Sequence, residues 1–289
     1  MGQTQAPSRR AVLASLALGP TAARAEAVPP QAIRFGLTPV FLDSDLALIR
    51  DLESYLNAAT GVPVELIKRR TYREVTAMLL SGQLDAAWIC GYPFVQHRSA
   101  LALLAVPLHR GSPLYQSYLI TGADSSARHL GDLRHQSHAF SDPDSNSGFL
   151  VTRWLLAQHG DRPEGFFTRT FFAHGHRNVI RAVATGLAQS GSVDGYVWEV
   201  MADREPHLTA GTRVLARSDW HGFPPICCLA STRGGAVARA LSAALVEMPR
   251  SDLGQRILGT LHLDGWVAGD PSWFDGIARM SAAVRSSDP

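Results

Sequence analysis

The order of apolar segments in the first ninety residues is the feature that most constrains the fold. Short stretches of strand type alternate with longer stretches whose apolar residues recur at the helical period. They read as strand, helix, strand, helix and strand over residues 32–37, 45–57, 62–67, 71–80 and 84–90. This order predicts an α/β fold with a parallel sheet, in which ligands bind beyond the carboxyl ends of the strands. Two loops lie there, Thr38 to Phe41 and Cys90 to Pro93.

A second α/β pattern follows an extended segment at residues 114–121. Further stretches read as strands at 138–140, 166–173, 193–198, 213–216 and 226–229, and as helices at 149–159, 179–187 and most of the C-terminal part. The chain has 289 residues, of which 46% are hydrophobic and 18% charged, so it can bury the cores of two medium domains. We therefore expect two α/β lobes.

A loop rich in serine, Ser141 to Gly148, leads from one predicted strand directly into a predicted helix. The first N–H groups of a helix have no partners within it and lie at the positive end of its dipole, so they form an anion site. The hydroxyls of Ser145 and Ser147 would add donors. Serine at this place also commonly caps the helix, and the local sequence does not separate the two roles.

The N-terminal residues are typical of an export signal. Arg9 and Arg10 precede an apolar run over residues 11–18, and small residues around Arg24 provide cleavage positions near Ala25 or Ala27. The run is shorter than the roughly 20 residues that span a bilayer, and paired arginines indicate the twin-arginine route. We expect residues 1–25 to be removed and the mature protein to be periplasmic.

The charge of the mature chain excludes a basic nucleic-acid-binding surface. Removal of residues 1–25 takes away three arginines and no acidic residue, which leaves 24 basic against 25 acidic residues. Three cysteines allow at most one internal disulfide, and Cys227 and Cys228 are adjacent, which is poor geometry for bridging each other. The spacings typical of zinc sites are absent from the sequence, so we expect no metal and no cofactor.

Several separated motifs, taken in order, resemble the phosphate/phosphite/phosphonate-binding receptors of ABC transporters. They are Gly36-x-Thr38-Pro39, Tyr72, Ser81-Gly82-Gln83-Leu84-Asp85-Ala86-Ala87-Trp88, Tyr92-Pro93, Asp142-x-x-Ser145-x-Ser147-Gly148, His176, Ala182-Val183-Ala184-x-Gly186 and Val193-Asp194. The match covers most of the mature chain.

The resemblance implies a type II periplasmic-binding fold, with two lobes and the ligand cleft between them. We place the first lobe at 31–117 and 224–289 and the inserted second lobe at 118–223, with crossings near Leu119 and Pro224 and the C-terminal helices on the first lobe. The lobes of such receptors close about a hinge. The implied function is not enzymatic: a monomer captures a small tetrahedral oxyanion and delivers it to an ABC permease.

The resemblance also assigns the site. Ser145, Ser147 and Gly148 would donate hydrogen bonds to the anion, and His176 would face it from a helix start; His174 is the weaker candidate. Thr38, Tyr72 and Tyr92 would form the rim, although both tyrosines could equally be packing residues. Asp194 would repel an anion and is expected to be structural, whereas Glu199 would orient a ligand amine or a neighbouring histidine.

Cys90 departs from the family pattern, because relatives commonly have a glycine-proline type turn before this tyrosine. It is either a small buried apolar residue or a thiol at the cleft wall. A thiol there suits a soft centre such as arsenite, so an alternative function is an arsenite sensor that signals to a membrane histidine kinase. Cys227 and Cys228 could then approach Cys90. A remote alternative is an exported hydrolase with Ser147 as nucleophile and His176 as base.

Overall fold

The computed structural model describes residues 1–2, 32–38 and 46–287. The chain divides into two units, Met1–Pro30 and Gln31–Pro289, and the account below concerns the second. The predicted export signal and its cleavage positions lie outside the described residues, as do residues 39–45. Within the described part, no helix has both the length and the apolar character needed to cross a membrane.

One mixed sheet has six strands in the order β13-β4-β12-β3-β1-β2. Its members are β1 (Ile33–Leu37), β2 (Val64–Lys68), β3 (Ala86–Trp88), β4 (Leu101–Leu108), β12 (Ile226–Leu229) and β13 (Gly265–Val267). β1 pairs in parallel with both β2 and β3, which confirms the predicted strand–helix order of the first ninety residues. β12 and β13 pair antiparallel to their neighbours, so the C-terminal part of the chain completes this sheet.

Local sequence features bound some of the helices around this sheet. They are α1 (Leu46–Thr60), α2 (Tyr72–Leu80), α3 (Gly91–Gln96), α9 (Ala236–Glu247), α10 (Asp252–Leu261) and α11 (Asp275–Ser287). The Thr71 side chain accepts the Glu74 N–H and Glu74 reaches back, which forms a capping box at the start of α2. Gly61, with φ of +69°, ends α1 in the left-handed conformation that glycine adopts without strain.

The other mixed sheet has five strands in the order β10-β6-β9-β7-β8. The strands are β6 (Ser117–Gly122), β7 (Ser137–Phe140), β8 (Arg169–Phe172), β9 (Ser190–Asp194) and β10 (Thr212–Arg217). Helical segments between them are η1 (Leu130–Leu133), η2 (Asn146–Leu150), α4 (Val151–Ala157), α5 (Pro163–Phe166), α6 (His176–Ala184), α7 (Gly195–Arg204) and α8 (Pro206–Thr209). Every one of these elements falls between residues 117 and 217.

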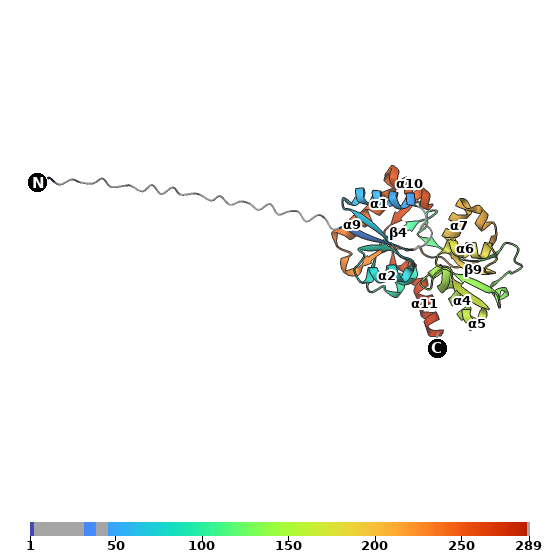
Figure 1. The fold of residues 1–289 in the computed structure, drawn as a ribbon. Coiled ribbons are helices and arrows are strands. Elements are labelled where there is room, and N and C mark those ends of the chain that lie inside the picture. The colour runs from blue at the N-terminus through green and yellow to red at the C-terminus, as the bar shows by residue number, and fades with distance from the viewer. Residues whose placement is uncertain (3–31, 39–45, 288–289) are drawn as a thin grey trace. The chain divides into compact units, whose positions relative to one another are not determined.

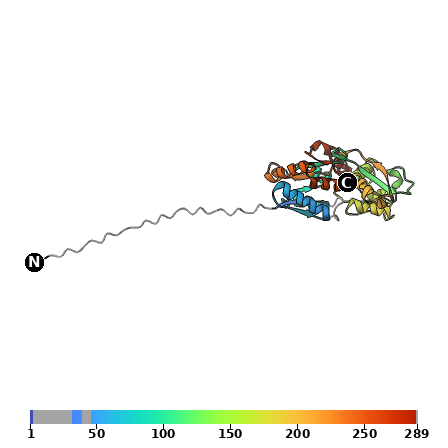
Figure 2. The same ribbon diagram turned by 90° about the horizontal axis from the view of Figure 1, so that it is seen from above.

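A short two-stranded sheet lies in the segments that connect the larger sheets. β5 (Leu114–Tyr115) pairs antiparallel with β11 (His221–Gly222). In Figure 1 the labelled helices α1, α2, α9 and α10 lie in one lobe, and α4, α5, α6 and α7 lie in the other; Figure 2 shows the same ribbon from above. Leu119, predicted near a crossing, lies inside β6. The lobe limits at 118 and 223 stay a prediction.

Several predicted elements differ in the structure, among them the helix predicted at 179–187, which spans His176–Ala184. The strand predicted at 193–198 ends at Asp194, because the Asp194 carboxylate accepts the N–H groups of Tyr196 and Val197 and caps α7. The strand predicted from Phe166 is shorter, since Pro163 begins a helical turn there. The helix predicted from Phe149 already begins at Asn146, in a wide turn closed by a bond of 3.0 Å from Leu150 N to Ser145 O.

The C-terminal helices do not all pack on the first lobe. α9 and α10 contact α1, as predicted, but α11 contacts both α3 and α4 and so lies against both lobes. Its Ile277 and Met280 are buried. α11 therefore couples the helix that follows Cys90 to the helix that follows the serine loop.

Candidate functional site

Ser145 caps the helical segment that follows β7. Its Oγ accepts the Gly148 N–H at 3.0 Å, and the side chain is fully buried. The helix cap, one of the two roles that the sequence left open for these serines, is therefore present. The Gly148 N–H is already hydrogen-bonded to Ser145 Oγ. The Ser145 hydroxyl proton is still a donor.

Gly148 is required by a close approach. A Cβ at this position would lie 1.8 Å from Ser141 Oγ, so no other residue fits without moving the loop. The Ser141 N–H donates to the Gly148 carbonyl at 3.1 Å, which holds the two ends of the loop together. Ser141 Oγ is itself buried and has no hydrogen-bond partner in the described structure.

Asn146, which the sequence prediction omitted, links the serine loop to Cys90 and Tyr115. Its N–H points at Cys90 Sγ at 3.3 Å, and its Nδ2 donates to the Tyr115 hydroxyl at 2.9 Å. Its Oδ1 is buried and has no hydrogen-bond partner in the described residues. Asn146 could have been predicted from the sequence, because it lies inside the serine motif. Tyr115 could not, because it lies in the connecting strand β5.

His176 is buried at the first position of α6 and contacts Tyr72 from the other lobe. The Asp194 N–H donates to Nδ1 at 3.0 Å, so the imidazole proton is on Nε2, which lies 3.3 Å from the Tyr72 hydroxyl oxygen. Burial lowers the pKa of His176 to about 3, so the ring is neutral at pH 7. Neither ring nitrogen is free to take a proton from Ser147, which removes the base that a hydrolase would need.

Two buried phenol oxygens accept hydrogen bonds from the second lobe. Tyr72 accepts from His176 Nε2, and Tyr115 accepts from Asn146 Nδ2, so in each case the phenolic O–H points elsewhere. Burial raises the pKa of both tyrosines well above the usual value. Both are therefore neutral donors at any physiological pH.

Cys90 is a buried thiol, 3% exposed, at the start of α3. Burial raises its pKa to about 12, although the N–H groups of Asn146 and Tyr92 oppose the shift. Cys227 and Cys228 are buried in β12, opposite Ala87 and Ala102 of the neighbouring strands, and all three cysteines are free. The thiolate that coordinates a soft centre is thus strongly disfavoured at this position.

Thr38 and Tyr92, two further predicted residues, lie in the part of the chain that forms the six-stranded sheet and its helices. The Thr38 hydroxyl donates to the Trp88 carbonyl at 3.1 Å, so it ties the end of β1 to β3. Tyr92 is 8% exposed and packs in a hydrophobic cluster that contains residues of both lobes.

Asp142 and Asp144 join the serine loop to the start of α2. Asp142 accepts the Asp144 N–H at 2.8 Å and the Tyr72 N–H at 3.4 Å, and Arg73 Nε lies 3.3 Å from Asp144. Burial raises the pKa of Asp142. Asp194 caps α7, as its expected structural role requires, and burial raises its pKa to about 7.

Six side chains from both lobes thus form one buried polar group, which we call the interlobe cluster: Tyr72, Cys90, Tyr115, Asn146, Ser147 and His176. All six are less than 4% exposed, and none carries a positive charge at pH 7. Contacts between Tyr72 and His176 and between Cys90 and Asn146 join the first lobe to the second. The arrangement is closed, with neutral donors facing one another.

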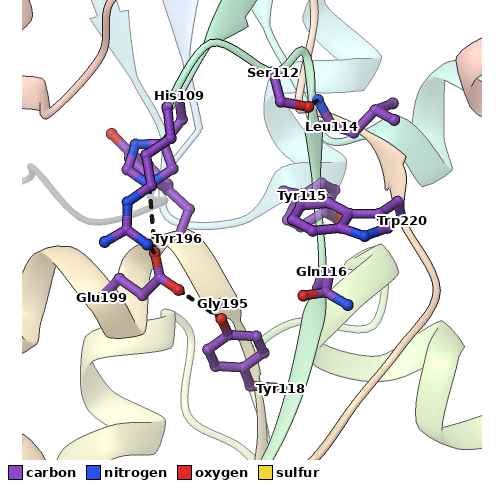
Figure 3. A pocket seen from close by; sticks show the side chains of 11 residues that line it. His109, Ser112, Leu114, Tyr115, Gln116, Tyr118, Gly195, Tyr196, Glu199 and Trp220 are labelled. Carbon is purple, nitrogen blue, oxygen red and sulfur yellow. Dashed lines mark hydrogen bonds and ion pairs between the residues drawn. The ribbon is translucent and has the colours of Figure 1, made fainter.

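A pocket of about 100 Å³ has Tyr115 among its lining residues (Figure 3). Tyr115, Tyr118, Tyr196 and Trp220 provide its aromatic walls, and Glu199 and His109 its polar ones. Glu199, in α7, accepts a hydrogen bond of 2.6 Å from the Tyr118 hydroxyl and lies 3.4 Å from His109 Nε2. Glu199 thus contacts a neighbouring histidine, His109, which is one of the two roles expected for it from the sequence. Among the described residues, no three His, Cys, Asp or Glu side chains are grouped to hold a metal.

The sequence and the fold both match known proteins. A family model described as "ABC transporter, phosphonate, periplasmic substrate-binding protein" matches residues 35–274. The phosphate-import protein PhnD of Mycolicibacterium smegmatis is 28% identical over 226 residues, which cover 72% of this chain and 70% of that protein.

Solved structures share the two-lobed fold. A binding protein component of a Pseudomonas aeruginosa phosphonate ABC transporter superimposes with a TM-score of 0.80 at 19% identity, over 89% of this chain and 87% of that one. PhnD1 of Prochlorococcus marinus, in complex with methylphosphonate, gives 0.77 at 16% identity, over 89% and 99%. These likenesses confirm the predicted type II fold, and the family match extends over most of the chain. The chain belongs to the family of periplasmic substrate-binding proteins of phosphonate ABC transporters.

Proposed function

We propose that the protein binds a small tetrahedral oxyanion, a phosphonate, phosphite or phosphate, between its lobes and delivers it to an ABC permease. The observation that carries this proposal is the interlobe cluster, in which buried donors of both lobes converge. The proposal includes export by the twin-arginine signal, cleavage near Ala25 or Ala27, and action as a periplasmic monomer.

The cluster suits an anion although it contains no cationic side chain. Tyr72 and Tyr115 offer phenolic protons, and the segment from Asn146 to Ala157 places the positive end of its helical backbone beside them. Hydrogen bonds to an ionised acceptor are about twice as strong as those between neutral groups. Fixed neutral donors hold an anion by shape and leave it releasable, as a transport receptor requires.

One acceptor among these donors indicates the protonation state of the ligand. Asn146 Oδ1 is buried without a partner, which costs about 1–3 kcal/mol unless a ligand supplies a donor. A phosphonate, phosphite or phosphate that retains one P–OH proton supplies it. A fully ionised anion such as sulfate has no proton to donate, and so leaves Oδ1 unsatisfied.

Calorimetric titration of the mature protein with phosphite, methylphosphonate, phosphate, sulfate and arsenite tests the proposal. We expect at least one of the three phosphorus anions to bind with a dissociation constant at least tenfold below that of sulfate. Titration with arsenite, repeated on the Cys90→Ser variant, tests the alternative function as an arsenite sensor. Binding of arsenite alone, abolished by Cys90→Ser, would contradict the transport function and support the sensor.

A further inference from the structure

The turn that follows β4 carries His109 and, in a strained conformation, Arg110. His109 and Ser112 exchange backbone hydrogen bonds of 3.0 and 3.1 Å, and the central residues Arg110 and Gly111 have φ of +52° and +75°. Positive φ at both central positions defines a type I′ turn, which favours Asn or Gly. Arginine here is unusual, and such strain persists at positions where the side chain has a function.

Both side chains of this turn, Arg110 and His109, meet one carboxylate of the other lobe. Arg110 Nη1 lies 3.0 Å and His109 Nε2 3.4 Å from Glu199 Oε2, while Tyr118 donates to Oε1 at 2.6 Å (Figure 3). The turn extends from the six-stranded sheet, whereas Glu199 belongs to α7. The strained turn therefore holds the lobes together at a place separate from the interlobe cluster.

The contacts of His109 are complete only when its ring is charged. Nδ1 lies 2.7 Å from the His262 carbonyl oxygen, and Nε2 faces the Glu199 carboxylate. Both partners only accept hydrogen bonds, so both ring nitrogens must carry protons for both bonds to form. A neutral His109 would present a lone pair to one of them.

The surroundings of His109 contain charges of both signs. Glu199 and Asp194 from the α7 side favour the imidazolium, whereas Arg110 on the same turn opposes it. Asp264 accepts the Gly111 N–H at 2.7 Å, His262 lies 3.6 Å from Asp203, and the Tyr196 ring contacts the His109 ring edge to face. Burial lowers the pKa of His109, but the hydrogen bonds to Glu199 and His262 raise it above its ordinary value.

We propose that His109, Arg110 and Glu199 form a proton-dependent latch, in which protonation of His109 stabilises the closed lobes and thereby strengthens oxyanion binding. The inference rests on the proposed function for its ligand. The same lobe arrangement contains the latch and the interlobe cluster, so a proton on His109 and a ligand in the cluster favour the same state. By linkage, each then raises the affinity for the other.

A proton titration tests the latch contact without a ligand. NMR follows the ring C–H signals of His109 from pH 5 to pH 9 in the mature protein and in Glu199→Gln. We expect the pKa of His109 to lie above the ordinary value of a histidine, and Glu199→Gln to lower it. An unchanged pKa of His109 in Glu199→Gln would overturn the latch. Added methylphosphonate should raise the pKa of His109 further; an unchanged value would overturn the coupling.

A binding titration tests the consequence. The dissociation constant for methylphosphonate is measured at pH 6 and pH 8 for the wild type, for His109→Asn, which keeps an amide donor but does not titrate, and for the control His159→Asn. The ionisation of the ligand affects all three proteins equally. We expect the pH 8 to pH 6 ratio to be roughly three- to tenfold larger in the wild type and the control than in His109→Asn. Equal ratios in all three would refute the coupling.

The two proposals fail in distinguishable ways. If methylphosphonate, phosphite and phosphate all fail to bind at either pH, the proposed function is wrong and so is the role of the latch in oxyanion binding. The titration of His109 in the wild type and in Glu199→Gln still decides, in that case, whether the lobes share a proton-dependent contact.

Discussion

The hydroxyl oxygen of Tyr72 lies 3.3 Å from Nε2 of His176, across the boundary between the two lobes. Because His176 Nδ1 accepts the Asp194 N–H, the ring proton is on Nε2. The Tyr72 oxygen accepts the hydrogen bond that this N–H donates. The backbone of the second lobe thus sets the tautomer of a histidine that in turn directs a phenolic proton of the first lobe. Ligand capture is expected to depend on this chain of bonds.

Replacement of Tyr72 by phenylalanine removes the donor and keeps the ring. We expect oxyanion affinity to fall roughly tenfold or more, because a hydrogen bond to a charged group is worth about 1.5–3 kcal/mol. Calorimetry with the best phosphorus anion measures the change. Tyr55→Phe is the matched control, since the Tyr55 hydroxyl is also buried but donates to the Ala244 carbonyl away from the cluster. Equal losses in both variants would argue against a ligand contact by Tyr72.

Replacement of Asn146 by alanine removes the link from the serine loop to Tyr115 together with the unpartnered Oδ1. We expect roughly tenfold weaker binding, because the ligand loses an acceptor and the lobes lose a bridge. The control Asn178→Ala removes an exposed asparagine of the second lobe whose Nδ2 donates to the Ala173 carbonyl at 2.9 Å. Unchanged affinity in Asn146→Ala would contradict the role given to Oδ1.

Replacement of Gly148 by alanine should destabilise the fold. The new Cβ would lie 1.8 Å from Ser141 Oγ, and overpacking of this kind costs about 1–3 kcal/mol. Urea denaturation measures the free energy of unfolding. Ser141→Ala in the same chain should restore part of the loss. The helical Gly259, which has open space around its Cβ position, is the control, and Gly259→Ala should stabilise by up to about 1 kcal/mol.

Buried neutral histidines should make the fold sensitive to acid. Burial lowers the pKa of His138 to about 3, as it does for His176, so below pH 6.5 the unfolded chain binds more protons than the folded one. The free energy of unfolding should therefore fall as the pH drops from 6.5 toward 3, by about 2 kcal/mol per histidine at pH 4.5.

Urea denaturation at pH 7 and pH 4.5 measures this effect. His138→Gln should reduce the difference between the two pH values even though it weakens the fold at both, because its bonds to Ser190 and Ser192 are altered. His159→Gln, on the surface, should leave the difference unchanged. The prediction is refuted if His138→Gln keeps the full pH dependence of the wild type.

Local sequence determined the elements whose signals lie within one segment. The alternating residues of β1, the capping box of α2 and the apolar face of α1 are visible in consecutive residues, so the first ninety residues were predicted almost element by element. The strands β4 and β13 of the same sheet were not predicted. The strand predicted at 193–198 was wrong because the local sequence does not distinguish an aspartate that caps a helix from one within a strand. Only the structure shows the Asp194 carboxylate accepting the N–H groups of Tyr196 and Val197.

The serine loop and His176 were found in the sequence because a loop before a helix start is a local pattern. Tyr115 carried no signal, since it lies in a two-residue strand between the lobes, and Cys90 was open between two roles that burial separates. Only the tertiary structure brings Tyr72, Cys90 and Tyr115 against Asn146 and His176, which are 31 to 104 residues away in the sequence. Periodicity and caps act over a few residues, whereas the protonation states and partners of this cluster depend on which groups two lobes bury against each other.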